Sequence, residues 1–182
     1  MANLKSKDFQ RLPELFMSNT DRYLPFIQFV ATIMDGESEL TRAQKEEIAL
    51  VVSGTNGCHY CTGAHSAILG NLGVDNERIE SAAKGSAAGA DEKMRAVLEF
   101  AKKLTVSPRD ISQSDTNAVS AAGWSDQTIE DVICIVSLFS FFNRLTDGMG
   151  IKGSEETFAQ AGEILSNGYG KVVDMLQQKP AA

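Results

Sequence analysis

The sequence is organised around one short stretch, Asn56-Gly57-Cys58-His59-Tyr60-Cys61-Thr62-Gly63-Ala64-His65. Two cysteines are separated by two residues, and a histidine follows four residues after the second. If Cys58 opens a helix, Cys61 and His65 fall on the same helix face, because residues three, four and seven apart are neighbours there. Thr55 or Asn56 is expected to cap this helix through a side-chain oxygen. The stretch therefore predicts a helix that carries two thiols with a histidine beside them.

The position of the two thiols favours ionisation. Both lie in the expected first turn, where unpaired backbone N–H groups and the helix dipole stabilise a thiolate. His65, one turn further along, is placed to take a proton from Cys61 or to return it. We therefore expect a dithiol site with its own base.

Structural zinc is the main alternative for a pair of cysteines at this spacing. A tetrahedral zinc site needs four ligands, usually from a second closely spaced pair. The chain offers Cys58 and Cys61, one of the two histidines (His59 or His65), and a lone Cys134 within an apolar run. No second pair is present, so we expect no metal, and Cys134 is most simply a small buried core residue.

Glu46, on the helix expected before the thiols, has two interpretations. Its carboxylate would orient His65 if that helix folds back over the dithiol, giving a relay from carboxylate to imidazole to thiol. Alternatively, Glu46 and Glu47 are first-turn charges stabilised by the helix dipole. Taken alone, the residues favour the second interpretation.

Length, composition and charge place the chain in a broad class. Its 182 residues make one domain, and 43% hydrophobic with 23% charged residues is typical of a globular protein. The net charge of −7 argues against nucleic acid or an anionic membrane as a partner. We expect no secretory signal and no membrane span, because no long apolar segment is present. Three cysteines, two of them paired by spacing, suit a reducing cytoplasm.

The remaining sequence predicts helices throughout and no sheet, so the fold class is all-α. Capping residues and apolar periodicity indicate a helix from Thr41 through Val52, then an interruption at 54–57. Further helices are expected at 25–34, 91–104, 111–122 and from Ser125 through Phe142. We expect a core at about 25–150, an N-terminal helical arm at 1–36 and a partly helical C-terminal tail at 151–182.

One internal similarity is visible. Aligning Val52-Ser53 with Val136-Ser137 places Glu46 on Glu130. The same alignment places the capping residue Thr41 on the capping residue Ser125. A duplicated helical hairpin, with the chemistry kept in one copy, and chance similarity between two amphipathic helices both fit this pattern.

Two apolar features bear on binding. Phe16, Tyr23, Phe26 and Phe29 would wall an apolar channel, although aromatic residues at helical spacing are more simply core. The run 132–142 is apolar on every face, which indicates either a subunit interface or a central helix.

The spacing Glu46-x11-Cys58-x2-Cys61-x3-His65, within the surrounding residues 40–73, resembles the alkylhydroperoxidase D-like (AhpD-like), peroxidase-related branch of the carboxymuconolactone decarboxylase family. Looser similarity continues through 91–104, 124–132 and 142–148. The resemblance implies one all-helical AhpD-like domain over 1–182 that needs no cofactor and forms a homo-oligomer, a trimer or a hexamer. Decarboxylase members lack this pair of cysteines, which argues against lactone decarboxylation.

The resemblance also implies a mechanism. Cys61 attacks a peroxide as a thiolate and becomes a sulfenic acid, and Cys58 resolves it to a Cys58–Cys61 disulfide. Glu46 and His65, acting through a water, remove the proton from Cys61. A dithiol donor of unspecified identity then restores the thiols.

One position departs from the family pattern. Some members carry a histidine directly before the second cysteine, where this chain has Tyr60, with His59 one residue earlier. Both residues are therefore accessory candidates. The sequence predicts a thiol-dependent hydroperoxide reductase, with a disulfide relay serving a separate peroxidase as the first alternative and a zinc-stabilised module as the second.

Overall fold

The computed structural model of the protein describes residues 3–4 and 8–178. Over these residues it contains ten α-helices, one short 3₁₀ helix and no β-strand, which confirms the all-α prediction. The helices are α1 (Leu12–Ser18), α2 (Thr20–Asp35), α3 (Arg42–Asn56), α4 (His59–Asn71), α5 (Asn76–Ala83), α6 (Glu92–Val106), α7 (Gln113–Ala121), α8 (Asp126–Met149), α9 (Glu155–Leu165) and α10 (Gly170–Gln177).

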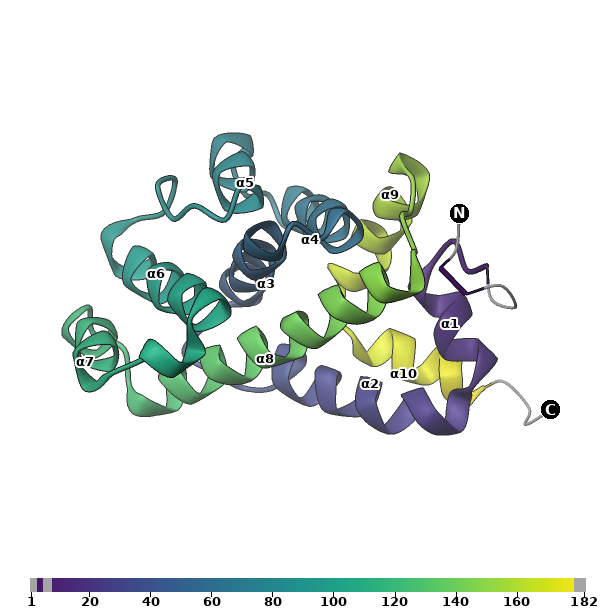
Figure 1. The fold of residues 1–182 in the computed structure, drawn as a ribbon, viewed down its shortest axis with the longest axis horizontal. Coiled ribbons are helices and arrows are strands. Elements are labelled where there is room, and N and C mark those ends of the chain that lie inside the picture. Colours follow the sequence, from purple (N-terminus) through teal and green to yellow (C-terminus); the bar gives the residue numbers. More distant parts are fainter. Residues whose placement is uncertain (1–2, 5–7, 179–182) are drawn as a thin grey trace.

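The long helix α8 is the axis of the fold. Helices α2, α3, α4 and α6 all pack against it, and Figure 1 shows it running through the length of the molecule. Its buried face carries Ile135, Val136 and Phe139, whereas Ile133 and Phe141 are 40% and 47% exposed. Most of the apolar run is therefore core of this chain, and one stripe remains outside.

Length and composition alone would allow α8 to cross a membrane. A central core helix has the same two properties, and the buried side chains of α8 pack in the hydrophobic core of this chain. The length and composition of α8 are therefore weak evidence for a membrane span.

The predicted capping residues begin the main helices. Thr41 accepts a hydrogen bond from the backbone N–H of Gln44, whose side chain returns to the Thr41 N–H. Asp91 and Ser125 cap α6 and α8 in the same way through their side-chain oxygens. These caps satisfy N–H groups that a helix start would leave unpaired, which is why the starts were predictable.

The junction between α3 and α4 differs from the prediction. The expected interruption at 54–57 is helical as far as Asn56, and Gly57 ends α3 in the left-handed conformation with φ of 71°. Thr55 and Asn56 therefore belong to the last turn of α3, and Cys58 itself occupies the N-cap position of α4. Gly54 does not break the helix. It allows α3 to approach α5 closely, since a Cβ on Gly54 would lie 2.3 Å from the carbonyl oxygen of Ala83 at the end of α5.

The C-terminal segment is an integral layer of the fold. Helix α9 packs along α4, and α10 packs against α2. Glycines permit this close approach, because a Cβ on Gly63 would meet the Phe158 ring at 2.5 Å. Tyr169 and Leu176 are buried beneath the two helices. The tail expected at 151–182 thus contains two helices, and the first of them, α9, begins at the capping residue Ser154, whose side chain accepts from the Thr157 N–H.

The remaining apolar expectations have mixed outcomes. Phe16 is buried, Phe26 packs on the rings of Phe141 and Phe142, and Phe29 is 50% exposed. Cys134 is half-buried, so it is not the small buried core residue that we expected.

The proposed duplication does not extend to the turn between helices. The alignment places Gly57 opposite Phe141, which lies inside the unbroken helix α8. The second copy therefore continues straight where the first copy turns into the cysteine helix, and no second hairpin forms at this register.

A pair of glycine substitutions tests the α3–α5 contact. Gly54→Ala should lower the free energy of unfolding by about 1–3 kcal/mol, the usual cost of overpacking a close contact. Gly70→Ala is the matched control in α4, because the space around Gly70 is open. It should be neutral or stabilise the fold by up to about 1 kcal/mol. Urea denaturation measures both, and equal effects of the two substitutions would contradict the close contact.

Candidate active site

The two cysteines of the CxxC motif lie where α3 turns into α4. The Gly57 turn lets the backbone N–H of Cys58 donate to the carbonyl of Ser53, which fixes the start of α4 against the end of α3. Cys58 and Cys61 are 0% and 4% exposed, and both are free thiols. The structure thus confirms a thiol pair at a helix start, held out of bulk water.

The two thiols have opposite ionisation tendencies. The Cys58 thiol donates a hydrogen bond to the Cys61 sulfur, and this bond, with burial, raises the pKa of Cys58. The same bond, helped by the nearby charge of His65, lowers the pKa of Cys61 to about 7 despite burial. Cys61 is therefore the sulfur that carries a thiolate near neutral pH.

Glu46 and His65 form a direct buried pair. Glu46 Oε2 lies 2.7 Å from His65 Nδ1, and both side chains are almost fully excluded from solvent. The Phe139 ring packs edge-on against the imidazole at 4.5 Å and holds its plane.

The first-turn interpretation of the two glutamates does not fit the structure. No acidic residue lies in the first turn of α3, and Glu46 faces the interior. Its neighbour Glu47 has a separate partner, a bidentate contact of 2.6 Å with the Arg78 guanidinium. Glu46 thus contacts the histidine that follows the cysteines, and Glu47 ties α3 to α5.

Asn143 is a site residue that the sequence analysis did not identify. Its amide orientation is fixed at both ends: Asn56 Nδ2 donates to Asn143 Oδ1 at 2.8 Å, and Asn143 Nδ2 donates to Ser53 Oγ at 3.0 Å. The same amide group donates to the Cys61 sulfur. Because the oxygen is already held by Asn56, the amide can only present N–H groups to the thiolate.

Thr146 also touches Cys61 but has a different role. Its Oγ1 lies 3.7 Å from Cys61 Sγ, while its single hydroxyl proton goes to the carbonyl of Phe142 at 2.7 Å. Asn143 is therefore the α8 residue with a proton to offer the sulfur. A signal existed in the sequence, since Asn143 and Thr146 are polar residues at core-facing positions of an apolar helix.

The two accessory candidates lie apart from the proton relay. His59 is exposed, and its ring packs edge-on against Phe158. Tyr60 is buried, and its hydroxyl accepts a hydrogen bond from the backbone N–H of Leu12. Tyr60 thus anchors the N-terminal helix, and its ring lines the cavity described next.

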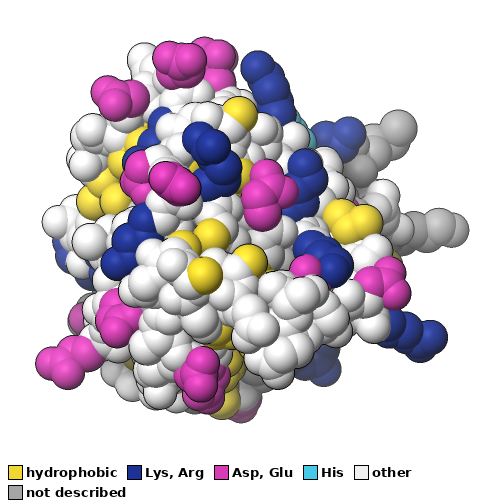
Figure 2. All heavy atoms as spheres, turned by 90° about the vertical axis from the view of Figure 1, so that its left-hand side faces the viewer, with side chains coloured by type: hydrophobic (Ala, Val, Ile, Leu, Met, Phe, Trp, Pro, Cys, Tyr) yellow, Lys and Arg dark blue, Asp and Glu magenta, His cyan; other side chains and the backbone are white. Residues whose placement is uncertain are grey.

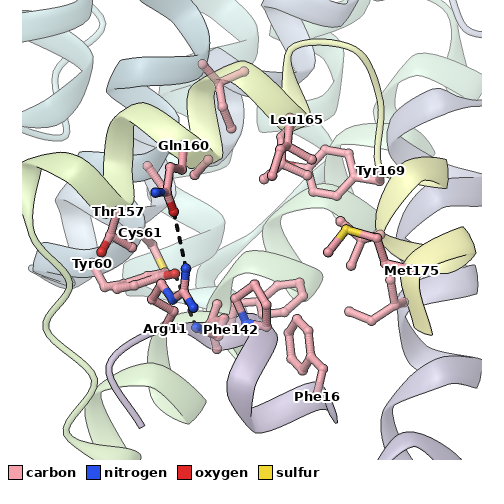
Figure 3. Close-up of a pocket in the computed structure, with 18 of the residues that line it drawn as sticks. Arg11, Phe16, Tyr60, Cys61, Phe142, Thr157, Gln160, Leu165, Tyr169 and Met175 are labelled. Carbon is pink, nitrogen blue, oxygen red and sulfur yellow. Dashed lines mark hydrogen bonds between the residues drawn. The ribbon is translucent and has the colours of Figure 1, made fainter. Parts of the chain in front are cut away.

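A cavity of about 230 Å³ opens beside Cys61 and His65. Its walls are mostly apolar and come from α1, α4, α8, α9 and α10, as Figure 3 shows. Phe16 lines it, as the channel hypothesis required, but Tyr23, Phe26 and Phe29 do not. Arg11 and Gln160 add polar groups at one side, where an Arg11 N–H donates to the Gln160 carbonyl oxygen at 3.2 Å.

The ligand set expected for structural zinc is missing from the described residues. No group of three His, Cys, Asp or Glu side chains there is arranged to hold a metal ion. The half-buried Cys134 lies on α8 outside the cavity lining.

Asn143 provides a test of the thiolate assignment. Alkylation of Cys61 by iodoacetamide, followed by mass spectrometry across pH, should show a midpoint near pH 7. Asn143→Ala removes a donor to the thiolate and should raise that midpoint by about one unit, since hydrogen bonds to charged groups contribute about 1.5–3 kcal/mol. Asn56→Ala is the control, because it removes only the partner of the amide oxygen and should shift the midpoint less. Equal midpoints in wild type and Asn143→Ala would exclude Asn143 as a thiolate donor.

Comparison with known proteins places this geometry in a family. The model of the carboxymuconolactone decarboxylase family matches residues 24–103. Among solved structures, an uncharacterized peroxidase-related protein from Silicibacter sp. TM1040 is similar with a TM-score of 0.76 and 28% identity, over 82% of this chain and 79% of that one.

Further structures extend the similarity. A peroxidase-related protein from Ralstonia eutropha JMP134, described as an alkylhydroperoxidase AhpD core, has a TM-score of 0.74 and 25% identity over 81% of this chain and 78% of that chain. The debrominase Bmp8 shares the fold, with a TM-score of 0.67 and 19% identity over 90% and 82% of the two chains. No curated protein sequence matches. The family match and the shared helical fold agree, and together they support membership of the carboxymuconolactone decarboxylase family in its AhpD-like branch.

Proposed function

We propose that the protein reduces organic hydroperoxides with the Cys58–Cys61 dithiol. The observation that carries the proposal is the place of Cys61 at the wall of an apolar cavity, hydrogen-bonded to a second thiol that helps to lower its pKa to about 7. A low-pKa thiol next to a resolving thiol is the arrangement expected for a peroxide-reducing site. Membership of an AhpD-like family supports a peroxide-related redox role at the family level.

The proposed reaction balances with two thiols and one hydroperoxide. The Cys61 thiolate attacks the terminal peroxide oxygen, the O–O bond breaks, and the alkoxide takes a proton from His65 to leave as an alcohol. Cys61 is then a sulfenic acid. Cys58 attacks that sulfur, a disulfide forms, and the hydroxyl leaves as water. The net change is two thiols and ROOH to a disulfide, ROH and water.

His65 and Glu46 supply the proton transfers in this scheme. The buried carboxylate of Glu46 contacts the imidazole at 2.7 Å and fixes its orientation for proton transfer. An imidazolium at the cavity wall can protonate the leaving alkoxide and then accept the proton of the Cys58 thiol. The high pKa of Cys58 suits a thiol that stays protonated until the sulfenic acid forms.

The cavity indicates the size and polarity of the substrate. Its volume of about 230 Å³ exceeds the roughly 150 Å³ of a cavity known to hold benzene. The lining includes the rings of Phe16, Phe139 and Phe142. A compact aromatic or branched alkyl hydroperoxide would bury its apolar part there, whereas hydrogen peroxide would leave the apolar walls unused.

The oxidised enzyme needs a dithiol donor for its next cycle. A reducing compartment suits a catalytic dithiol whose cysteines must return to the free state, so we propose a cytoplasmic location. If the donor is a protein, the same dithiol would pass electrons onward from it, which is the relay alternative with a separate peroxidase.

A second candidate reaction is reductive dehalogenation of an aromatic compound. The similarity to the debrominase Bmp8 is one of fold alone, but the aromatic walls of this cavity would also accept a small halogenated ring. The electron balance is the same, since an aryl bromide and two thiols would give the arene, a disulfide and hydrogen bromide.

A thiol-state experiment tests the proposed function. Reduced protein is treated with one equivalent of cumene hydroperoxide, and loss of two hydrogens, mapped to Cys58 and Cys61, is followed by intact mass. Cys61→Ser should slow peroxide consumption by on the order of 10³-fold or more, as expected for loss of a nucleophile. Cys58→Ser should stop at a sulfenic acid that dimedone traps. Cys134→Ser is the control and should react like the wild type.

The other outcomes of that experiment are distinct. Reduced thiols after cumene hydroperoxide, together with disulfide formation by 2,3,4-tribromopyrrole, would replace the peroxidase proposal by the dehalogenase. Rapid exchange with a protein disulfide but no reaction with either compound would favour the relay.

We also propose that the exposed stripe on α2 and α8 joins copies of this chain. Phe29, Ile133 and Phe141 are all at least 40% exposed, and α2 packs beside α8. By contrast, the end of the molecule seen in Figure 2 mixes acidic and basic side chains with scattered hydrophobic ones. Large apolar side chains grouped outside a core mark association surfaces.

Sedimentation velocity tests this assembly. The wild type should sediment as a trimer or hexamer, and Ile133→Glu should shift it toward monomer because a charge would be buried in the interface. Val106→Glu is the control, since Val106 is 64% exposed on α6 and lies outside the stripe. A monomeric wild type would rule out this role for the stripe.

A further inference from the structure

Tyr169, in the turn between α9 and α10, reaches the centre of the cysteine site. Its side chain is buried, and its hydroxyl donates to Glu46 Oε2 at 3.4 Å. It also lines the cavity, on the side opposite Cys61 and Tyr60 in Figure 3. This residue lies outside the 24–103 segment that the family model matches.

A separate set of contacts holds Tyr169 in place. The carboxylate of Asp35, at the end of α2, accepts from the backbone N–H groups of Tyr169 and Gly170 at 3.1 and 2.8 Å. Arg42, the first residue of α3, pairs with Asp35 at 2.5 Å and donates to the carbonyl of Leu165 at 3.0 Å. We name Asp35 and Arg42 the latch. It fixes both sides of the α9–α10 turn to the helices that precede the site.

Glu46 depends on few hydrogen-bond donors. It is fully buried, and its Oε2 accepts hydrogen bonds from both His65 Nδ1 and the Tyr169 hydroxyl. Its other oxygen, Oε1, has no hydrogen-bond partner in the described part of the chain. A buried carboxylate loses the stabilisation of water, so each remaining donor has a large effect on whether it stays charged.

We propose that Tyr169 is a positioning residue of this site: its hydroxyl holds the Glu46 carboxylate against His65, and the latch holds the hydroxyl there. The inference rests on the proposed dithiol function, in which the His65 imidazolium stabilises the Cys61 thiolate. Tyr169 touches neither sulfur and acts through Glu46 and His65.

The direction of the effect follows from the charges around the pair. Without the Tyr169 hydroxyl, Glu46 keeps a single donor, the His65 ring, and its carboxylate is held by one contact fewer. His65 is then held less firmly beside Cys61, so the His65 charge that helps to lower the pKa of Cys61 acts on it less. Other titratable or charged groups lie near the four site residues Glu46, His65, Cys61 and Tyr169. Cys58 and Tyr60 lie beside Cys61, and Asp147 lies near Cys58. Asp35 and Arg42 lie near Tyr169.

Tyr169→Phe tests the proposal with the ring retained. The midpoint of Cys61 alkylation should rise from near pH 7 by about one unit, the scale expected for loss of a nearby charge. Tyr23→Phe is the matched control, a buried tyrosine outside the cavity lining, and should leave the midpoint unchanged.

Imidazole nitrogen NMR gives a second readout, because the chain has only two histidines. The His65 signal should shift in Tyr169→Phe, because Glu46, the partner of His65 Nδ1, loses the hydroxyl that holds it. The exposed His59 serves as an internal reference that should not move.

Each outcome of these measurements decides the proposal. A folded Tyr169→Phe with an unchanged midpoint and an unchanged His65 signal would overturn it. If Tyr169→Phe does not fold, Asp35→Ala decides instead, since it loosens the latch without touching Glu46 and should shift the midpoint in the same direction. Neither readout uses a peroxide, so lack of turnover in wild type would overturn the proposed function and leave this inference standing.

Discussion

The buried contact between Glu46 and His65 is the constraint on which the rest of the site depends. Removing a carboxylate and an imidazole from water costs several kcal/mol per ion unless they are paired and supplied with further hydrogen bonds. The fold meets this requirement with three elements: α3 carries Glu46, α4 carries His65, and α8 presses Phe139 against the imidazole. The sharp turn at Gly57 lets α3 and α4 face each other closely enough for the contact.

The same arrangement separates the roles of two chemically identical thiols. Cys61 interacts with the imidazole and the Asn143 amide, whereas Cys58 donates a hydrogen bond to Cys61 and keeps its proton. One sulfur is thus stabilised as a thiolate at the expense of the other. A disulfide-forming site needs this asymmetry, because the attacking sulfur must be ionised while the resolving sulfur waits as a thiol. Burial alone would have raised the pKa of both.

The sequence predicted the parts of this structure that local chemistry decides. Thr41, Asp91 and Ser125 begin helices because their side chains satisfy N–H groups within the same turn. The spacing of Cys58, Cys61 and His65 placed them on one face for the same local reason. What was missed depends on contacts between distant segments: Gly54 is a glycine inside a helix because Ala83 leaves no room for a side chain, and Tyr169 contacts Glu46 from a turn 123 residues further along the chain. Asn143 lies between these cases, since a polar residue on the buried face of α8 was a readable signal.

The cysteine site and the cavity walls come from different parts of the chain. Glu46, Cys58, Cys61 and His65 all lie within residues 24–103, the part that the family model matches. The walls of the cavity come largely from outside it, from α1, α8, α9 and α10. A dithiol with a carboxylate–histidine pair can transfer two electrons to several kinds of acceptor, so the pair does not by itself select a substrate. Selection must come from the shape of the cavity, and the helices that shape it are the ones that the latch and the Arg11–Gln160 contact hold over the thiols. On the proposed function, the central α3–α4 hairpin would carry the chemistry, and the segments packed over that hairpin would select the substrate.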